Sequence, residues 1–123
     1  MKIIDISVEG MNRLDKFDKS VSLDEIFNDV INSLNVDHNK IKSVIRSREL
    51  VLARQIYCYV ASLTGRYSLS KIATLIGNRH HSTVLVSIRK VKNNISVKDP
   101  LFMDSWDQYI ENSKIWGKYK PKY

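Results

Sequence analysis

The sequence is poor in the residues that build disulfides, phosphate loops and membrane spans. Cys58 is the single cysteine in 123 residues, so no intramolecular disulfide can form and a reducing compartment fits best. None of the four glycines belongs to a Gly-x-x-x-x-Gly-Lys loop, so we do not expect ATP to be bound in that way. No apolar run comes near the ~20 residues that a membrane-spanning helix needs. The first segment carries Asp5 and Glu9 and is not a secretory signal, so the expected location is cytoplasmic.

The residue patterns of catalytic and metal sites are also missing. The carboxylates form no recognisable acid–base pair and there is no nucleophile motif, so neither enzyme activity nor a cofactor is expected. His80 and His81 are adjacent, and side chains of adjacent helical residues point about 100° apart. Because no cysteine or carboxylate ligand set accompanies these two histidines, no metal site is predicted.

Positive charge is abundant but unevenly distributed. The formal net charge is +7, and the segment from Lys40 to Lys98 holds twelve lysines and arginines against one acid, Glu49. Most acids lie in the flanks, over 15–37 and 99–111. A basic middle segment between acidic flanks is typical of proteins that bind a polyanion such as nucleic acid. The alternative is a solvated basic surface without a partner.

The stretch 67–91 predicts two helices joined by a tight turn. Ser68 is a good N-cap for the first helix, and Gly77 supplies the left-handed backbone at which helices often end. Asn78 is expected to cap the second helix, which runs over about 80–95. Apolar residues recur at helical spacing in both segments: Leu69, Ile72, Ala73 and Ile76, then Val84, Ile88, Val91 and Ile95. This is the pattern of a helix-turn-helix, whose second helix enters the DNA major groove.

Helix-start signals outside this stretch predict three further helices. The segment from Ser22 to Glu25 fits a capping box, which opens a helix that ends near Asn35. A long apolar helix is predicted over 49–63, and Asp99 followed by proline starts the last one. The expected core residues are Ile26, Phe27, Val30, Ile31 and Leu34, then Leu52, Ile56, Tyr59, Val60 and Leu63 with Tyr57 near an edge, and finally Leu101, Trp106, Tyr109, Ile110 and Trp116.

Together these elements predict an all-α fold. We expect a small bundle of about five to six helices over 21–116, with the helix-turn-helix at about 68–95. Residues 1–20 are interpreted as an N-terminal arm or linker, extended or disordered. Residues 117–123 are interpreted as a basic, frayed C-terminal tail.

Three segments carry a more specific pattern. They are Arg46-Ser47-Arg48 ahead of Ala53-Arg54-Gln55-Ile56, Leu63-Thr64-Gly65 with Tyr67-Ser68-Leu69-Ser70-Lys71-Ile72, and Ile76-Gly77-Asn78-Arg79-His80-His81-Ser82-Thr83-Val84-Leu85. In order and separation they resemble the C-terminal DNA-binding domain of the bacterial replication initiator family DnaA, whose signature is Gly-Gly-Arg-Asp-His-Thr-Thr-Val-Leu. The likeness covers roughly residues 23–97, and it implies the fold of that domain (domain IV), which is similar to Trp repressor.

The resemblance implies a mode of binding to double-stranded DNA, with contacts to bases in both grooves and contacts to phosphates. The implied base-contacting residues are Arg46, His80, His81, Ser82 and Thr83, with Arg46 in the minor groove and the others in the major groove. The implied phosphate-contacting residues are Arg48, Arg54, Gln55, Ser68, Lys71, Asn78 and Arg79. By resemblance the chain binds as a monomer on an asymmetric site, and a dimer through residues 1–20 is the alternative.

Two departures from the family pattern matter. The family's base-contacting aspartate is replaced by His80, so we expect a target sequence different from the standard initiator box, or weaker discrimination. The family's ATPase module is not represented in this sequence, so the chain is interpreted as a stand-alone DNA-binding module or a fragment. The rival functions are a protein-interaction module that binds replication proteins, and nucleic-acid binding by charge alone.

Overall fold

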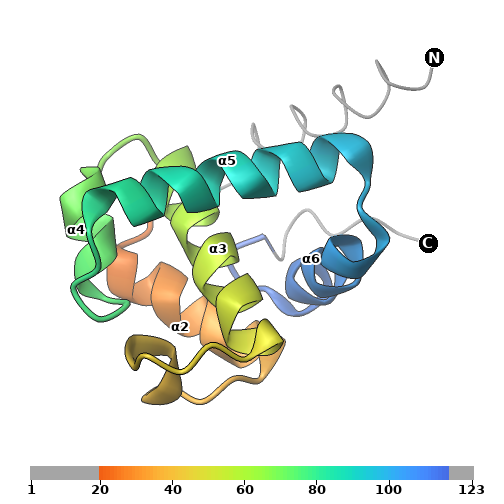
Figure 1. Ribbon diagram of the computed structural model, residues 1–123, viewed down its shortest axis with the longest axis horizontal. Coiled ribbons are helices and arrows are strands. Elements are labelled where there is room, and N and C mark those ends of the chain that lie inside the picture. Colours follow the sequence, from red (N-terminus) through yellow and green to blue (C-terminus); the bar gives the residue numbers. More distant parts are fainter. Residues whose placement is uncertain (1–19, 117–123) are drawn as a thin grey trace.

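The computed structural model describes residues 20–116, which form five α-helices and one short 3₁₀ helix (Figure 1). In chain order they are α2 (Leu23–Leu34), η1 (Lys40–Lys42), α3 (Arg48–Leu63), α4 (Leu69–Thr74), α5 (His81–Val97) and α6 (Pro100–Asn112). The all-α prediction is therefore confirmed, with no strand among the described residues. The arm predicted for residues 1–20, apart from Ser20, and the tail predicted for 117–123 lie outside them.

Helix α3 is the centre of the bundle and packs against each of the other described elements. α5 crosses α3, with α4 beside the first turns of α5 and α6 beside its C-terminal end (Figure 1). α2 closes the opposite side of α3 and packs along α6. α3 thus supports the helix-turn-helix on its buried side, as a rigid scaffold for the exposed face.

Tyr57 and Leu101 do not lie where the periodicity placed them. Tyr57, expected near an edge, is fully buried because α3 is covered on several sides, and its hydroxyl donates to the Ile72 carbonyl at 2.9 Å. That bond joins α3 to α4, and burial raises the pKa of the phenol. Leu101, expected in the core, is 59% exposed because α6 turns Phe102 and Trp106 inward instead.

The other expected core residues are buried or partly buried. Burial raises the pKa of the Cys58 thiol to about 12, which keeps it protonated and suits the small core residue that the sequence predicts. The fully buried side chains with the largest volumes are Tyr57, Tyr109, Phe102, Ile26, Ile41, Ile56, Ile72, Ile76, Val30, Val60, Val84 and Val91.

Helix starts follow the local capping signals closely. The Ser22 hydroxyl accepts from the Glu25 amide at 3.1 Å, and the Glu25 carboxylate accepts from the Ser22 amide at 2.9 Å, which completes the predicted capping box. Ser68 caps α4 through the amide of Lys71, and Asp99 caps α6 ahead of its N-terminal proline. The starts of α2, α4 and α6 are therefore each encoded within a few residues of the helix start.

Asp29 on α2 fastens the end of α6 to the bundle. Its carboxylate accepts from the Tyr109 hydroxyl at 3.0 Å, the Ser113 hydroxyl at 2.6 Å and the Lys114 amide at 2.7 Å. Tyr109 is fully buried, and its pKa is raised by burial first and by the Asp29 carboxylate second. Removal of the carboxylate would therefore leave buried donors without an acceptor.

Asp29→Ala is expected to lower the free energy of unfolding by about 3 kcal/mol, because it deletes the acceptor of three hydrogen bonds, two of them from the buried residues Tyr109 and Ser113. Urea denaturation followed by circular dichroism measures the change. Asp24→Ala, at an exposed position on the same helix, is the matched control and should lose about 0.5 kcal/mol. Equal losses in the two variants would contradict the anchoring role of Asp29.

Candidate nucleic-acid interface

The turn between α4 and α5 takes its shape from two residues with left-handed backbone. Gly77 has φ +93° and Asn78 has φ +54°. The prediction that Asn78 caps α5 is wrong, since an N-cap needs an extended backbone and Asn78 does not have one. The N-cap is His80, with φ −64° and ψ 144°. Asn78 instead supplies a left-handed backbone conformation, which asparagine adopts more readily than most residues.

His80 caps α5 with its ring rather than with a hydroxyl or a carboxylate. The Nδ1 atom accepts from the Ser82 amide at 3.1 Å and lies 2.7 Å from the Ser82 hydroxyl. The His80 and His81 rings pack against each other, with their centroids 4.2 Å apart. His80, His81, Ser82 and Thr83 are all exposed, so this first turn of α5 presents four polar side chains to solvent.

The loop that carries Arg46 is held by two arginines from other elements. Arg54 of α3 is buried, and it donates to the carbonyls of Ile41 at 2.9 Å, Lys40 at 3.1 Å and Ser43 at 3.0 Å. Arg79, from the helix-turn-helix, donates to the same Ser43 carbonyl at 2.6 Å. The loop is therefore joined at one oxygen atom to α3 and to the turn that precedes α5.

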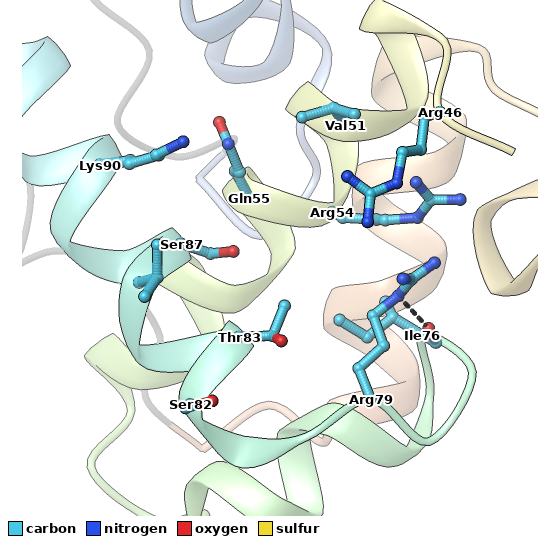
Figure 2. Close-up of a pocket in the computed structure, with 11 residues that line it drawn as sticks. Arg46, Val51, Arg54, Gln55, Ile76, Arg79, Ser82, Thr83, Ser87 and Lys90 are labelled. Atoms are coloured by element: carbon cyan, nitrogen blue, oxygen red, sulfur yellow. Dashed lines mark hydrogen bonds between the residues drawn. The ribbon is translucent and has the colours of Figure 1, made fainter. Parts of the chain in front are cut away.

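A groove opens between this loop, α3 and α5, and we call it the basic groove. It is lined by Arg46, Val51, Arg54, Gln55, Ile76, Arg79, Ser82, Thr83, Val86, Ser87 and Lys90. Figure 2 shows the side chains of Arg46, Arg54 and Arg79 gathered on one side, while Ser82, Thr83, Ser87 and Lys90 follow α5 on the other. No acidic residue belongs to this lining.

The cations of the groove are close enough to affect one another. Burial lowers the pKa of Arg54, and the positive charges of Arg79 and Arg46 lower it further. Arginine stays protonated despite such shifts, so the charges persist. Without an acid in the groove lining, the arrangement favours an anion in the groove, and phosphate is one of the anions whose geometry an arginine fork fits.

The structure brings part of the predicted site into this groove and leaves the rest around it. Arg46, Arg54, Gln55, Arg79, Ser82 and Thr83 line the groove. Arg48 lines a neighbouring groove that Gln55 and Lys90 also border. The other members are exposed at the ends of the two helices: Ser68, Lys71, Asn78, His80 and His81. The individual contacts of these residues with DNA remain predictions.

Arg54 has a role that the sequence did not indicate. Its Nε and Nη2 atoms are occupied by carbonyls of the loop, so a phosphate contact would rest on its remaining nitrogen, Nη1. Lys90 was not among the predicted residues, yet it lines both grooves. Its position seven residues after Thr83, two turns along the same face of α5, is the signal that would have identified it.

The chain is similar to a known protein family and to several curated proteins. The family described as the bacterial dnaA protein helix-turn-helix matches residues 23–91. The chromosomal replication initiator protein DnaA of Bacteroides fragilis is 38% identical over 79 residues, which cover 64% of this chain and 17% of that protein. The DnaA of Lachnoclostridium phytofermentans is 38% identical over 93 residues, which cover 76% of this chain and 20% of that protein. The DnaA of Streptococcus thermophilus is 37% identical over 81 residues, which cover 66% of this chain and 18% of that protein.

The aligned part of the chain thus spans about a fifth of the length of these curated relatives. No solved structure matches the chain significantly. Within residues 20–116, no helix is both long enough and apolar enough to cross a membrane.

Proposed function

This chain belongs to the bacterial DnaA helix-turn-helix family, and on that premise we propose that it binds double-stranded DNA in a sequence-specific manner. A helix-turn-helix domain of this family is a DNA-binding module rather than a catalytic one.

The observation that carries the proposal is the basic groove between the Arg46 loop and α5. In a duplex, one sugar–phosphate strand separates the major groove from the adjacent minor groove. When α5 lies in the major groove and Arg46 lies in the minor groove, that strand passes over the basic groove. Its phosphates then meet Arg79, Gln55 and Lys90, which are charged or polar and line the same groove (Figure 2).

Base recognition is assigned to the first turn of α5 and to the loop. His81, Ser82 and Thr83 are exposed at the N-terminal end of α5, where recognition helices make their base contacts. The Thr83 methyl group suits a thymine methyl group. Arg46 is exposed on its loop and suits an A·T-rich minor groove, whose narrow width concentrates negative potential. Membership of the family favours binding as a monomer on an asymmetric site.

The test is selection of bound duplexes from a random pool, followed by affinity measurements on the enriched sequence. Arg46→Ala and His81→Ala are each expected to weaken binding to that sequence about tenfold or more, while binding to unrelated DNA falls much less. Lys114→Ala is the matched control, since it removes one positive charge at the α2–α6 junction, away from the groove. Affinities are compared at one fixed salt concentration.

Two results would contradict the proposal. Enrichment of no motif, with affinity that depends on salt alone, would identify a charge-driven binder of nucleic acid. Absence of DNA binding would favour a protein-interaction module that binds replication proteins. If a motif is enriched, its genomic positions will tell whether the chain acts at replication origins or at regulated genes.

A further inference from the structure

The ring of His80 is fixed by contacts on its Nδ1 edge. A backbone N–H, that of Ser82, is directed at Nδ1 from 3.1 Å. A backbone amide can only donate, so Nδ1 must accept and cannot carry a proton in this arrangement. The neutral ring therefore carries its proton on Nε2. Contact with the His81 ring restricts the ring further, so its orientation is set in the free protein.

The same argument fixes the hydroxyl of Ser82. The oxygen lies 2.7 Å from Nδ1, and because Nδ1 has no proton, the hydroxyl is the donor in this contact. The Ser82 hydroxyl oxygen can then only accept a further hydrogen bond. The first turn of α5 therefore exposes a donor at His80 Nε2 and an acceptor at Ser82 Oγ, although both side chains could take either role in isolation.

We propose that His80 is a specificity-determining residue that donates from Nε2 to guanine in the major groove, an inference that rests on the proposed function. The two ring nitrogens lie on opposite edges of the imidazole, so Nε2–H points away from the backbone that Nδ1 caps. Guanine presents two acceptors in the major groove, N7 and O6, whereas adenine and thymine present one each and cytosine presents only an amino donor.

The replacement of the family's aspartate then changes the preferred base rather than abolishing recognition. A carboxylate at this position accepts, and its partner is the amino group of cytosine. His80 caps the helix, as an aspartate would, but offers the opposite hydrogen-bonding character to the DNA. One position of the target sequence accordingly differs from that of relatives with aspartate, while the positions contacted by His81 and Thr83 do not change.

The tautomer is tested first, on the free protein, by nitrogen-15 NMR of the histidine rings. The expected result at a pH where the rings are neutral is a proton on His80 Nε2 and an unprotonated, hydrogen-bonded Nδ1. Observation of the Nδ1–H tautomer would overturn the inference without any bearing on whether the chain binds DNA, since the proposed function does not depend on that proton.

The base preference is tested by selection from a random pool with the wild type, His80→Asp and His80→Asn. Asp and Asn are both good N-caps, so thermal unfolding should change little and the start of α5 should be preserved. At one base position we expect guanine for the wild type, cytosine for His80→Asp and adenine for His80→Asn. Exchange of the preferred base should change affinity on the order of five- to tenfold.

The outcomes separate this inference from the proposed function. The same motif from all three proteins would show that position 80 contacts no base, and it would overturn the inference while sequence-specific binding stands. No motif from the wild type would overturn the proposed function, and the inference with it. A change of base at a single position, in the stated direction, would support both.

Discussion

Gly77→Ala is expected to lower the free energy of unfolding by about 3 kcal/mol, which corresponds to a fall in Tm of roughly 15 °C for a domain of this size. Two effects add. Gly77 has φ +93°, a conformation that an L side chain adopts only with strain of about 1–2 kcal/mol. A Cβ at this position would also collide with the Lys42 carbonyl oxygen, which is backbone and cannot rotate away.

Gly65→Ala is the matched control for this prediction. Gly65 also has positive φ, +68°, but a Cβ there would meet no atom within 4 Å, so only the strain of the backbone applies. We expect a loss of about 1 kcal/mol. Thermal unfolding of both variants separates the two effects. Equal destabilisation of the two variants would mean that the collision with the Lys42 carbonyl oxygen adds nothing to the stability loss of Gly77→Ala.

Arg54→Ala is expected to lower the free energy of unfolding by about 3–4 kcal/mol and to weaken binding to the selected duplex. The guanidinium donates three hydrogen bonds to carbonyls, and hydrogen bonds from a charged donor contribute about 1.5–3 kcal/mol each. Their loss leaves the Ile41 and Lys40 carbonyls without this donor and releases the loop that carries Arg46. We expect affinity to fall about tenfold at a temperature where the variant is still folded.

Arg54→Lys distinguishes positioning from charge. Lysine keeps the positive charge, but its single ammonium group cannot replace the planar fork that serves three carbonyls. We therefore expect Arg54→Lys to resemble Arg54→Ala, with partial recovery at most. Arg48→Ala removes one exposed charge at the first residue of α3 and should change stability by no more than about 0.5 kcal/mol. Wild-type stability and affinity in Arg54→Lys would show that charge alone matters at this position.

Much of the fold was predictable from the sequence because helix boundaries depend on local chemistry. Ser22, Ser68 and Asp99 begin helices through bonds to amides three residues later, and those contacts can be inferred from the sequence alone. Apolar spacing predicted the buried faces of α2 and α5 correctly. Tyr57 was misplaced because a helix that is covered on several sides has no single buried stripe to detect.

The candidate site was only partly predictable, because its decisive contacts are not local. Asparagine is a better N-cap than histidine by general preference. Asn78 has the left-handed backbone of the turn, however, and an N-cap needs an extended backbone, so His80 is the N-cap of α5. The resemblance implied only a phosphate contact for Arg54, not a bond to the protein backbone. Its partners are backbone carbonyls 11–14 residues away, and side chain-to-backbone bonds across that separation leave no pattern in the sequence.

The Ser43 carbonyl, which accepts hydrogen bonds from both Arg54 and Arg79, also fixes the separation between the loop that carries Arg46 and the helix-turn-helix. In the proposed complex, hydrogen bonds from two sides fix that separation, rather than a flexible linker. A duplex with different groove widths or curvature fits only after the DNA or the loop deforms, and the free energy of that deformation depends on the stiffness of each base step. In the proposed complex, base pairs that touch no side chain are therefore expected to contribute to selectivity, so we expect the mechanics of the DNA, as well as its base edges, to influence which sites are bound.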